Sequence, residues 1–106
     1  MDLQYVAVTV TLVAANTPYH LLDLLRAIEP NCPTAARQLC LQSDWGNGNA
    51  VVSVGDAHIG AGRRGYTLVA GDSRVYTSNL KNVRVANRYL RSDTPGALIN
   101  VELETA

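Results

Sequence analysis

The sequence predicts a mainly β protein, an antiparallel β-sandwich of the jelly-roll kind with one short helix in its N-terminal half. Two observations predict this fold. Apolar and polar residues alternate with a period of two in most segments, and turn sequences with glycine or proline recur at intervals of about ten residues. Seven or eight short strands with this spacing are typical of sandwiches and small barrels. The length of 106 residues suits a single domain, residues 1–106.

The first strand is expected in the segment LQYVAVTVTLVAAN, residues 3–16. One face of it carries Val6, Val8, Val10 and Leu12. The opposite face carries Tyr5, Ala7, Thr9 and Thr11. Alternation of this kind, with many β-branched residues, is typical of a strand. Because the second face has no charged residue, we expect it to be covered as well, as an interface between copies of the chain.

A helix is expected over residues 18–29. Thr17 suits the N-cap, and Pro18 suits the first helical position, where its missing N–H is not needed. Pro30 is expected to end the helix. The residues that recur at helical spacing are Leu21, Leu24, Leu25 and Ile28.

The rest of the chain reads as short strands separated by turns. The expected strands lie in residues 35–44, 50–56, 66–78, 79–93 and 97–106. Within 79–93, Val83, Val85 and Tyr89 are expected on one strand face, with Arg84 and Arg88 on the other. The sequence DWGNGN, residues 44–49, predicts a tight hairpin turn, because Asn-Gly pairs supply positive φ angles. A second turn is expected at residues 70–72.

The charge distribution predicts one contact surface. The formal net charge is +0, which argues against nucleic acid as a partner. Between residues 63 and 91, however, seven cations accompany a single acid, Asp72. We expect this segment to bind carboxylates of a partner, although a solvated strand face would have the same composition. The residues expected to make the contact are Arg63, Arg64, Tyr66, Arg84 and Arg88.

No cofactor, metal or membrane contact is expected. Cys32 and Cys40 are not spaced as metal ligands, and His20 and His58 lie far apart in the sequence. Free thiols are the default expectation, and a disulfide is possible only if the turn between the two cysteines brings them together. The first apolar run is about eleven residues long, too short to cross a bilayer, and the N-terminus does not have the pattern of a signal peptide.

Two short motifs suggest catalysis but fit turns better. Gly71-Asp72-Ser73 matches the nucleophile tripeptide of one esterase class, yet no histidine follows His58 to serve as a base. Asp93 lies in SDTPGA, similar to the Asp-Thr-Gly-Ala of dimeric aspartic proteases, but Pro95 replaces the glycine. The glycine-rich loop near Arg63 is not a phosphate-binding loop. We therefore expect a non-enzymatic protein with no catalytic residues.

The C-terminal half, from Asn49 onward, resembles small all-β structural proteins of tailed-bacteriophage virions. The matching pattern is a strand that ends in Val54-Gly55-Asp56, followed by a Gly-x-x-Leu-x-x-Gly-Asp-Ser stretch over residues 65–73. The resemblance implies a capsid decoration (cement) protein on the capsid exterior, assembled in the host cytoplasm. Its implied partners are the major capsid protein and further copies of itself, commonly as a homotrimer. A head fibre, an adaptor or a tail component is also compatible with it.

Two other classes remain open on the residues themselves. A generic β-sandwich module that binds a sugar or a protein predicts a concave face with an exposed aromatic residue, and Trp45 is the candidate. A small enzyme on a cupin-like barrel would need a His-x-His metal site, and DAHIG offers a single histidine.

Overall fold

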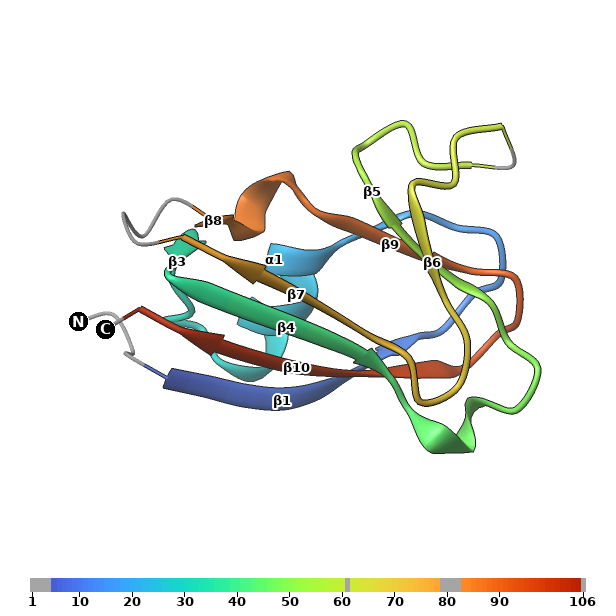
Figure 1. Cartoon of the computed structure of the whole chain (residues 1–106), viewed down its shortest axis with the longest axis horizontal. Coiled ribbons are helices and arrows are strands. Elements are labelled where there is room, and N and C mark those ends of the chain that lie inside the picture. Colours follow the sequence, from blue (N-terminus) through green and yellow to red (C-terminus); the bar gives the residue numbers. More distant parts are fainter. Residues whose placement is uncertain (1–4, 61, 79–82, 106) are drawn as a thin grey trace.

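The computed structural model describes residues 5–60, 62–78 and 83–105, which form antiparallel sheets and one α-helix (Figure 1). The mainly β class and the helix in the N-terminal half are therefore confirmed. The strands are β1 Tyr5–Leu12, β2 Tyr19–His20, β3 Ala35–Ala36, β4 Gln38–Ser43, β5 Val52–Gly55, β6 Tyr66–Leu68, β7 Ser73–Thr77, β8 Val83–Arg84, β9 Tyr89–Ser92 and β10 Ala97–Glu104. The helices are α1 Leu21–Ile28 and the 3₁₀ turns η1 Trp45–Asn47 and η2 Val85–Asn87.

The strands pair in a nested pattern. One sheet has the order β1-β10-β4-β7, a second has the order β2-β9-β5-β6, and β3 pairs with β8. The pair β5–β6 lies inside β4–β7 in the sequence, and β3–β8, β2–β9 and β1–β10 enclose it in turn. All these pairs are antiparallel, so the second half of the chain retraces the first. Two further pairings, β10–β4 and β5–β9, complete the four-stranded sheets.

The predicted alternation in the long strands is confirmed. In β1, Val6, Val10 and Leu12 are buried, whereas the residues between them are exposed or half-buried. β4 buries Leu39 and Leu41 in the same way, and β10 buries every second residue. These residues join those of the second sheet in one cluster. Each large aliphatic side chain buried there contributes about 1.5–3 kcal/mol through the hydrophobic effect.

The helix is shorter than predicted and begins three residues later. Tyr19 and His20 are extended because they pair with Leu90 and Tyr89 of β9. The Leu21 N–H then donates to the Arg88 carbonyl (3.0 Å). The pairing of Tyr19 and His20 with β9 thus prevents the helix from beginning at the predicted cap, Thr17 and Pro18. α1 packs against β1 and η2, and in Figure 1 it lies behind β4 and β7.

Buried leucines rather than Ile28 attach the helix to the core. Leu21, Leu22 and Leu25 are buried, but Ile28 is 48% exposed.

The segment after β8 also differs from the prediction of a single strand. Val85 begins the 3₁₀ turn η2, in which the N–H groups of Val85 and Ala86 both donate to the Thr34 carbonyl (3.0 and 3.4 Å). Val83 and Val85 are both buried nevertheless. The turn separates β8 from β9, so that Tyr89 no longer follows the alternation of Val83 and Val85.

The two predicted turns connect sheets rather than the strands of a hairpin. Residues 44–49 lie between β4 of the first sheet and β5 of the second, and the Asp44 carboxylate caps η1 by accepting from the Gly46 N–H (2.9 Å). Residues 70–72 connect β6 of the second sheet to β7 of the first. The sequence predicted a turn correctly in both places. It did not predict that the strands on either side of each turn belong to different sheets.

A glycine series tests the turn geometry. Gly48, Gly65 and Gly71 have φ of 61°, 66° and 84°, so alanine is strained at each. A Cβ on Gly48 meets open space, a Cβ on Gly71 would lie 2.6 Å from the Trp45 ring, and a Cβ on Gly65 would collide with the Val54 carbonyl. We expect Gly48→Ala to cost about 1 kcal/mol and Gly65→Ala about 3 kcal/mol in the free energy of unfolding, with Gly71→Ala between them. Urea denaturation measures this, and equal losses for the three variants would contradict it.

Candidate partner-binding surface

The flank of the molecule where the edge strand of each sheet lies, β7 in the first sheet and β6 in the second, is the candidate site. Arg74 and Tyr76 of β7 lie opposite Leu41 and Leu39, which are buried. Because opposed residues in a ladder point to the same side of the sheet, Arg74 and Tyr76 face the core side. No strand of the described chain lies beyond β7 in its sheet.

The second sheet contributes a matching residue. Tyr66 of β6 lies opposite the buried Val54, so its ring also faces the core side of its own edge strand. The backbone just before β9 contributes Arg88. These four residues, Tyr66, Arg74, Tyr76 and Arg88, form what we call the Arg–Tyr stack.

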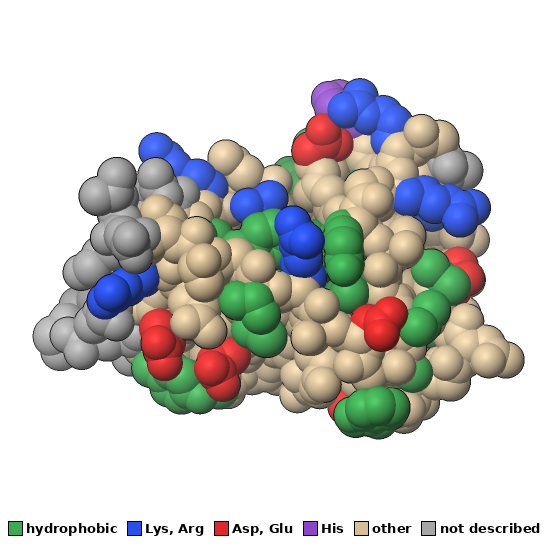
Figure 2. Space-filling view, viewed as in Figure 1, with side chains coloured by type: hydrophobic (Ala, Val, Ile, Leu, Met, Phe, Trp, Pro, Cys, Tyr) green, Lys and Arg blue, Asp and Glu red, His purple; other side chains and the backbone are tan. Residues whose placement is uncertain are grey.

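Guanidinium groups and phenol rings alternate in the Arg–Tyr stack. The Cζ of Arg88 lies 4.1 Å from the Tyr76 ring centre, and the Cζ of Arg74 lies 5.1 Å from Tyr76 and 4.6 Å from Tyr66. Each contact is within the range of a cation–π interaction. Figure 2 shows basic and apolar side chains side by side on this flank, between β7 and β6. The rings shield the flank of the core, and above them Arg74 is exposed and Arg88 is half-buried.

The two stacked arginines have no carboxylate partner within the described part of the chain. The salt bridges found there join His20 to Asp23 and Arg63 to Asp56. The Nε of Arg88 is buried and has no hydrogen-bond partner. Two permanent positive charges are therefore held in place without a counter-charge from residues 5–60, 62–78 and 83–105. Arginine in this state suits a planar, bidentate acceptor such as a carboxylate.

The structure brings together two of the five predicted partner-binding residues, Tyr66 and Arg88. Arg63 instead pairs with Asp56, with Nη2 3.0 Å from Oδ2. Arg84 is exposed in β8, and Arg64 lines a separate polar hollow of about 200 Å³.

Sequence reasoning missed Arg74 and Tyr76 as members of the site. The available sequence signal was their spacing of two residues within a predicted strand, which puts both side chains on one face. The sequence did not reveal that this face lies at the unprotected flank of the core.

The four residues predicted for an oligomer interface lie together on one surface. Tyr5, Ala7, Thr9 and Thr11 are all exposed on the outer face of β1, which is an edge strand of the first sheet. The prediction that these residues share one face of a strand is therefore confirmed, and in the single chain this face is exposed. A contact with a second copy stays a prediction.

The Gly71-Asp72-Ser73 motif forms a turn, as predicted. Gly71 has a φ of 84°. The Asp72 carboxylate accepts from the Val69 N–H (3.2 Å), and the Asp72 N–H donates to the Val69 carbonyl (2.9 Å). Ser73 then begins β7 opposite Gln42.

Asp93 acts as a structural tie rather than as a member of a proton-sharing carboxylate pair. Its carboxylate accepts from the Val51 N–H (2.9 Å) and from the Thr94 hydroxyl (2.8 Å). These hydrogen bonds, the first above all, hold the pKa of the Asp93 carboxyl below its usual value. A carboxyl that shares a proton at neutral pH needs a raised pKa instead.

Other candidate chemistries lack the residues they need in the described chain. Within residues 5–60, 62–78 and 83–105, no three His, Cys, Asp or Glu residues are grouped so that they could hold a metal ion. Cys32 and Cys40, whose pairing the sequence left open, form no disulfide. Among the described helices, none is long and apolar enough to cross a membrane.

Comparison of the chain with protein-family models, with curated proteins and with solved structures found no match. Its function must therefore be inferred from its own geometry.

A double-mutant cycle tests the Arg–Tyr stack. We expect Tyr76→Leu and Arg88→Met to be coupled by about 1 kcal/mol in the free energy of unfolding, because each removes the same cation–π contact. Urea denaturation of the parent, both single variants and the double variant measures the coupling. The matched control pairs Arg88→Met with Tyr5→Leu, which lies on a different surface and should show additive effects. Additivity in the test cycle as well would contradict the contact.

The Asp93 tie predicts a pH-dependent stability difference. Because its folded-state pKa is lowered, the ionised carboxylate stabilises the fold above the unfolded-state value of about 3.9, and this contribution is lost as the pH falls through the folded-state pKa. We expect Asp93→Asn to be less stable than the parent at neutral pH and equally stable near pH 2. Urea denaturation at both pH values measures this, and a difference that persists in acid would contradict it.

Proposed function

We propose that this protein is a non-enzymatic structural component of a virion, a capsid decoration protein that binds the capsid exterior and stabilises the head. The observation that carries the proposal is the Arg–Tyr stack, with two fixed cations that have no carboxylate partner in the described chain. Such a surface fits a partner whose own surface presents carboxylates. The proposed partner is the major capsid protein.

We also propose that the two four-stranded sheets are the layers of a β-sandwich with jelly-roll topology. The nested pairing supports this: with the short pair β3–β8 set aside, the strands pair first with eighth, second with seventh, third with sixth and fourth with fifth. Such pairing is what a long antiparallel hairpin produces when it is rolled up into two sheets. Viral capsid domains are among the proteins with this architecture, as are lectin domains and cupins. Architecture alone does not determine function, so the surface residues carry the functional argument.

The stacked arginines are suited to fixing the orientation of a partner. Both guanidinium groups are held against rings, so less side-chain freedom is lost when they bind than for a free lysine. Arginine charges at an interface accelerate association and suppress incorrect registers. Because the stack is at the surface, salt should weaken the contact.

Self-association is part of the proposal, with a homotrimer as the expected state. β1 is an edge strand of eight residues, YVAVTVTL, with no charged residue and no proline. Charges, proline and bulges are the usual protection of an edge against pairing with another chain. The residues proposed at this interface are Tyr5, Ala7, Thr9 and Thr11, through the edge of β1 and its flanking side chains.

The sites proposed for the capsid and for a second copy are therefore on different surfaces. A head fibre, an adaptor or a tail component would use the same stack with another virion protein. Neither nucleic acid nor a membrane is a proposed partner.

Binding to empty heads tests the proposal. The probe is heads assembled from the major capsid protein encoded by the same genome, mixed with the purified protein in rising salt. We expect saturable binding that weakens with salt, and about tenfold or greater loss of affinity in the double variant Arg74→Gln/Arg88→Gln. Arg37→Gln, an exposed arginine outside the stack, is the matched control and should bind as the parent does.

Two results would contradict the proposal. Absence of binding at every salt concentration would exclude the capsid as the partner, and equal binding by the double variant would exclude the stack as the contact. Sedimentation equilibrium of the free protein tests the proposed trimer separately, and a monomer at micromolar concentration would overturn it.

A further inference from the structure

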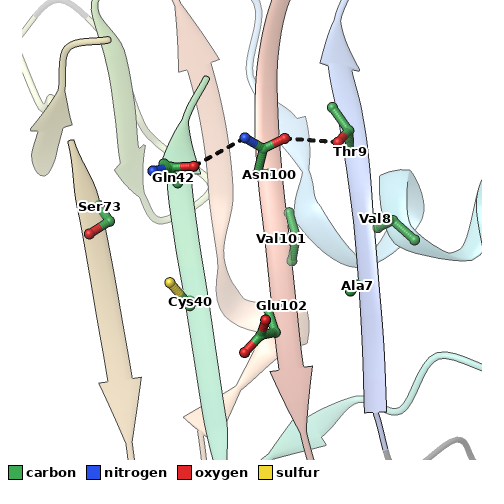
Figure 3. Close-up of a pocket in the computed structure, with 9 residues that line it drawn as sticks. All are labelled: Ala7, Val8, Thr9, Cys40, Gln42, Ser73, Asn100, Val101 and Glu102. Atoms are coloured by element: carbon green, nitrogen blue, oxygen red, sulfur yellow. Dashed lines mark hydrogen bonds between the residues drawn. The ribbon is translucent and has the colours of Figure 1, made fainter. Parts of the chain in front are cut away.

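A hollow lies on the outer face of the first sheet, on the side away from the core. Its volume is about 520 Å³, within the range of small-molecule binding sites. The side chains that matter for its chemistry come from all four strands (Figure 3) and are Ala7, Thr9, Gln42, Ser73, Asn100 and Glu102. No basic residue lines it.

Small side chains create the hollow. Ala7 of β1 and Cys40 of β4 lie on either side of Glu102 of β10, directly opposite it in the two ladders. Neither neighbour is long enough to cover the sheet beside the carboxylate. A wide, shallow space is left along the middle of the face, as Figure 3 shows.

A row of hydrogen-bonded side chains crosses the sheet beside this space. The Thr9 hydroxyl donates to the Asn100 Oδ1 (2.8 Å), and the Asn100 amide nitrogen donates to the Gln42 Oε1 (3.2 Å) and the Asp44 Oδ1 (3.1 Å). These bonds determine which way each amide points. The Gln42 side-chain nitrogen consequently faces away from Asn100, and it donates to no group of the described chain. It is a pre-oriented donor at the hollow.

The Glu102 carboxylate supplies an acceptor in the same space. The Tyr5 hydroxyl donates to its Oε2 (3.0 Å), which leaves Oε1 available. Ser73, at the far side next to Gln42, can donate and accept. The hollow thus presents a donor, an acceptor and a hydroxyl in positions set by the sheet.

An exposed indole follows directly after the end of the side-chain row. Trp45 comes one residue after Asp44, which accepts the last bond of the row, and it is 76% exposed. Its ring lies against Gly71, where even a Cβ would approach it to 2.6 Å. The glycine therefore lets the ring rest on the backbone, while most of its surface is open to solvent. A large exposed aromatic ring is a common feature of binding surfaces.

We infer that this face binds a neutral saccharide, with its hydroxyls on Gln42, Ser73 and Glu102 and a neighbouring ring packed on Trp45. A sugar hydroxyl both donates and accepts, which matches the mixed set in the hollow, and the C–H faces of a sugar ring suit an aromatic surface. An anionic ligand is disfavoured, because the hollow contains a carboxylate and no cation. A purely apolar ligand would leave the Gln42 and Glu102 groups without partners.

The inference does not rest on the capsid proposal. Ala7 and Thr9 also belong to the surface proposed for self-association, so a saccharide and a second copy of the chain would compete for this face. The Arg–Tyr stack lies on the flank of the core at β6 and β7, and the hollow lies on the outer face of the first sheet. A protein docked through the stack could therefore still present this face to a glycan.

A titration with defined sugars tests the site. The probes are the methyl glycosides of glucose, galactose, mannose and N-acetylglucosamine and the corresponding trisaccharides, followed by amide and indole NMR shifts of the full chain. We expect at least one trisaccharide to shift Thr9, Gln42, Ser73 and the Trp45 indole with an affinity in the millimolar range or tighter. Absence of any shift at about 50 mM, roughly −2 kcal/mol of binding or less, would overturn the inference.

Matched variants locate the binding. Ala7→Leu fills the hollow from an exposed position and should abolish the shifts, whereas Thr11→Leu, on the same face of the same strand but outside the hollow, should preserve them. Trp45→Ala should weaken trisaccharide binding about fivefold or more and change monosaccharide binding much less. Binding unaffected by Ala7→Leu would overturn the inference. An oligomer that buries this face and dissociates in the Ala7→Leu variant would also overturn the saccharide inference, and it would support the proposed self-association instead.

Discussion

The pairing of the first and last strands determines which side of the main sheet is core and which is surface. β1 and β10 are antiparallel over eight residue pairs, from Tyr5 opposite Glu104 to Leu12 opposite Ala97. Side chains alternate along a strand, so a shift of one residue in this register would turn the buried side chains of β1 to solvent. The cost would be the burial of Val6, Val10 and Leu12, several kcal/mol in total. The register is thereby strongly specified.

The same register builds the outer face. Thr9 lies opposite Asn100, which in turn lies opposite Gln42. Three polar residues distant in sequence thus form one hydrogen-bonded row across the sheet. The row is a consequence of core burial, because each member alternates with a buried neighbour. The small residue Ala7, two residue pairs further along, leaves the hollow beside the row.

The Arg–Tyr stack covers a different part of the molecule, the flank formed by β7 and β6, which are the edge strands of the two sheets. Tyr76 and Tyr66 cover the apolar interior there, and the arginines extend the cover while their charges remain hydrated. A structural role and a binding role are compatible in this arrangement. The guanidinium groups contact the faces of the tyrosine rings, and their N–H groups remain available to a carboxylate of a partner. The stack and the hollow lie on separate surfaces, so one molecule can engage an acidic partner and a neutral ligand at the same time.

The sequence by itself determined the strands whose alternation is strong, β1, β4 and β10, and the turn at Gly71, because periodicity and backbone preference are local. It also pointed to a basic segment and to Trp45. Only the tertiary structure decided where the helix begins, because pairing of Tyr19 with β9 is a long-range event that outweighs a local cap. The contacts within the Arg–Tyr stack and within the polar row were also decided by the tertiary structure. Strand pairing determines which distant residues meet, and the local sequence does not specify that pairing.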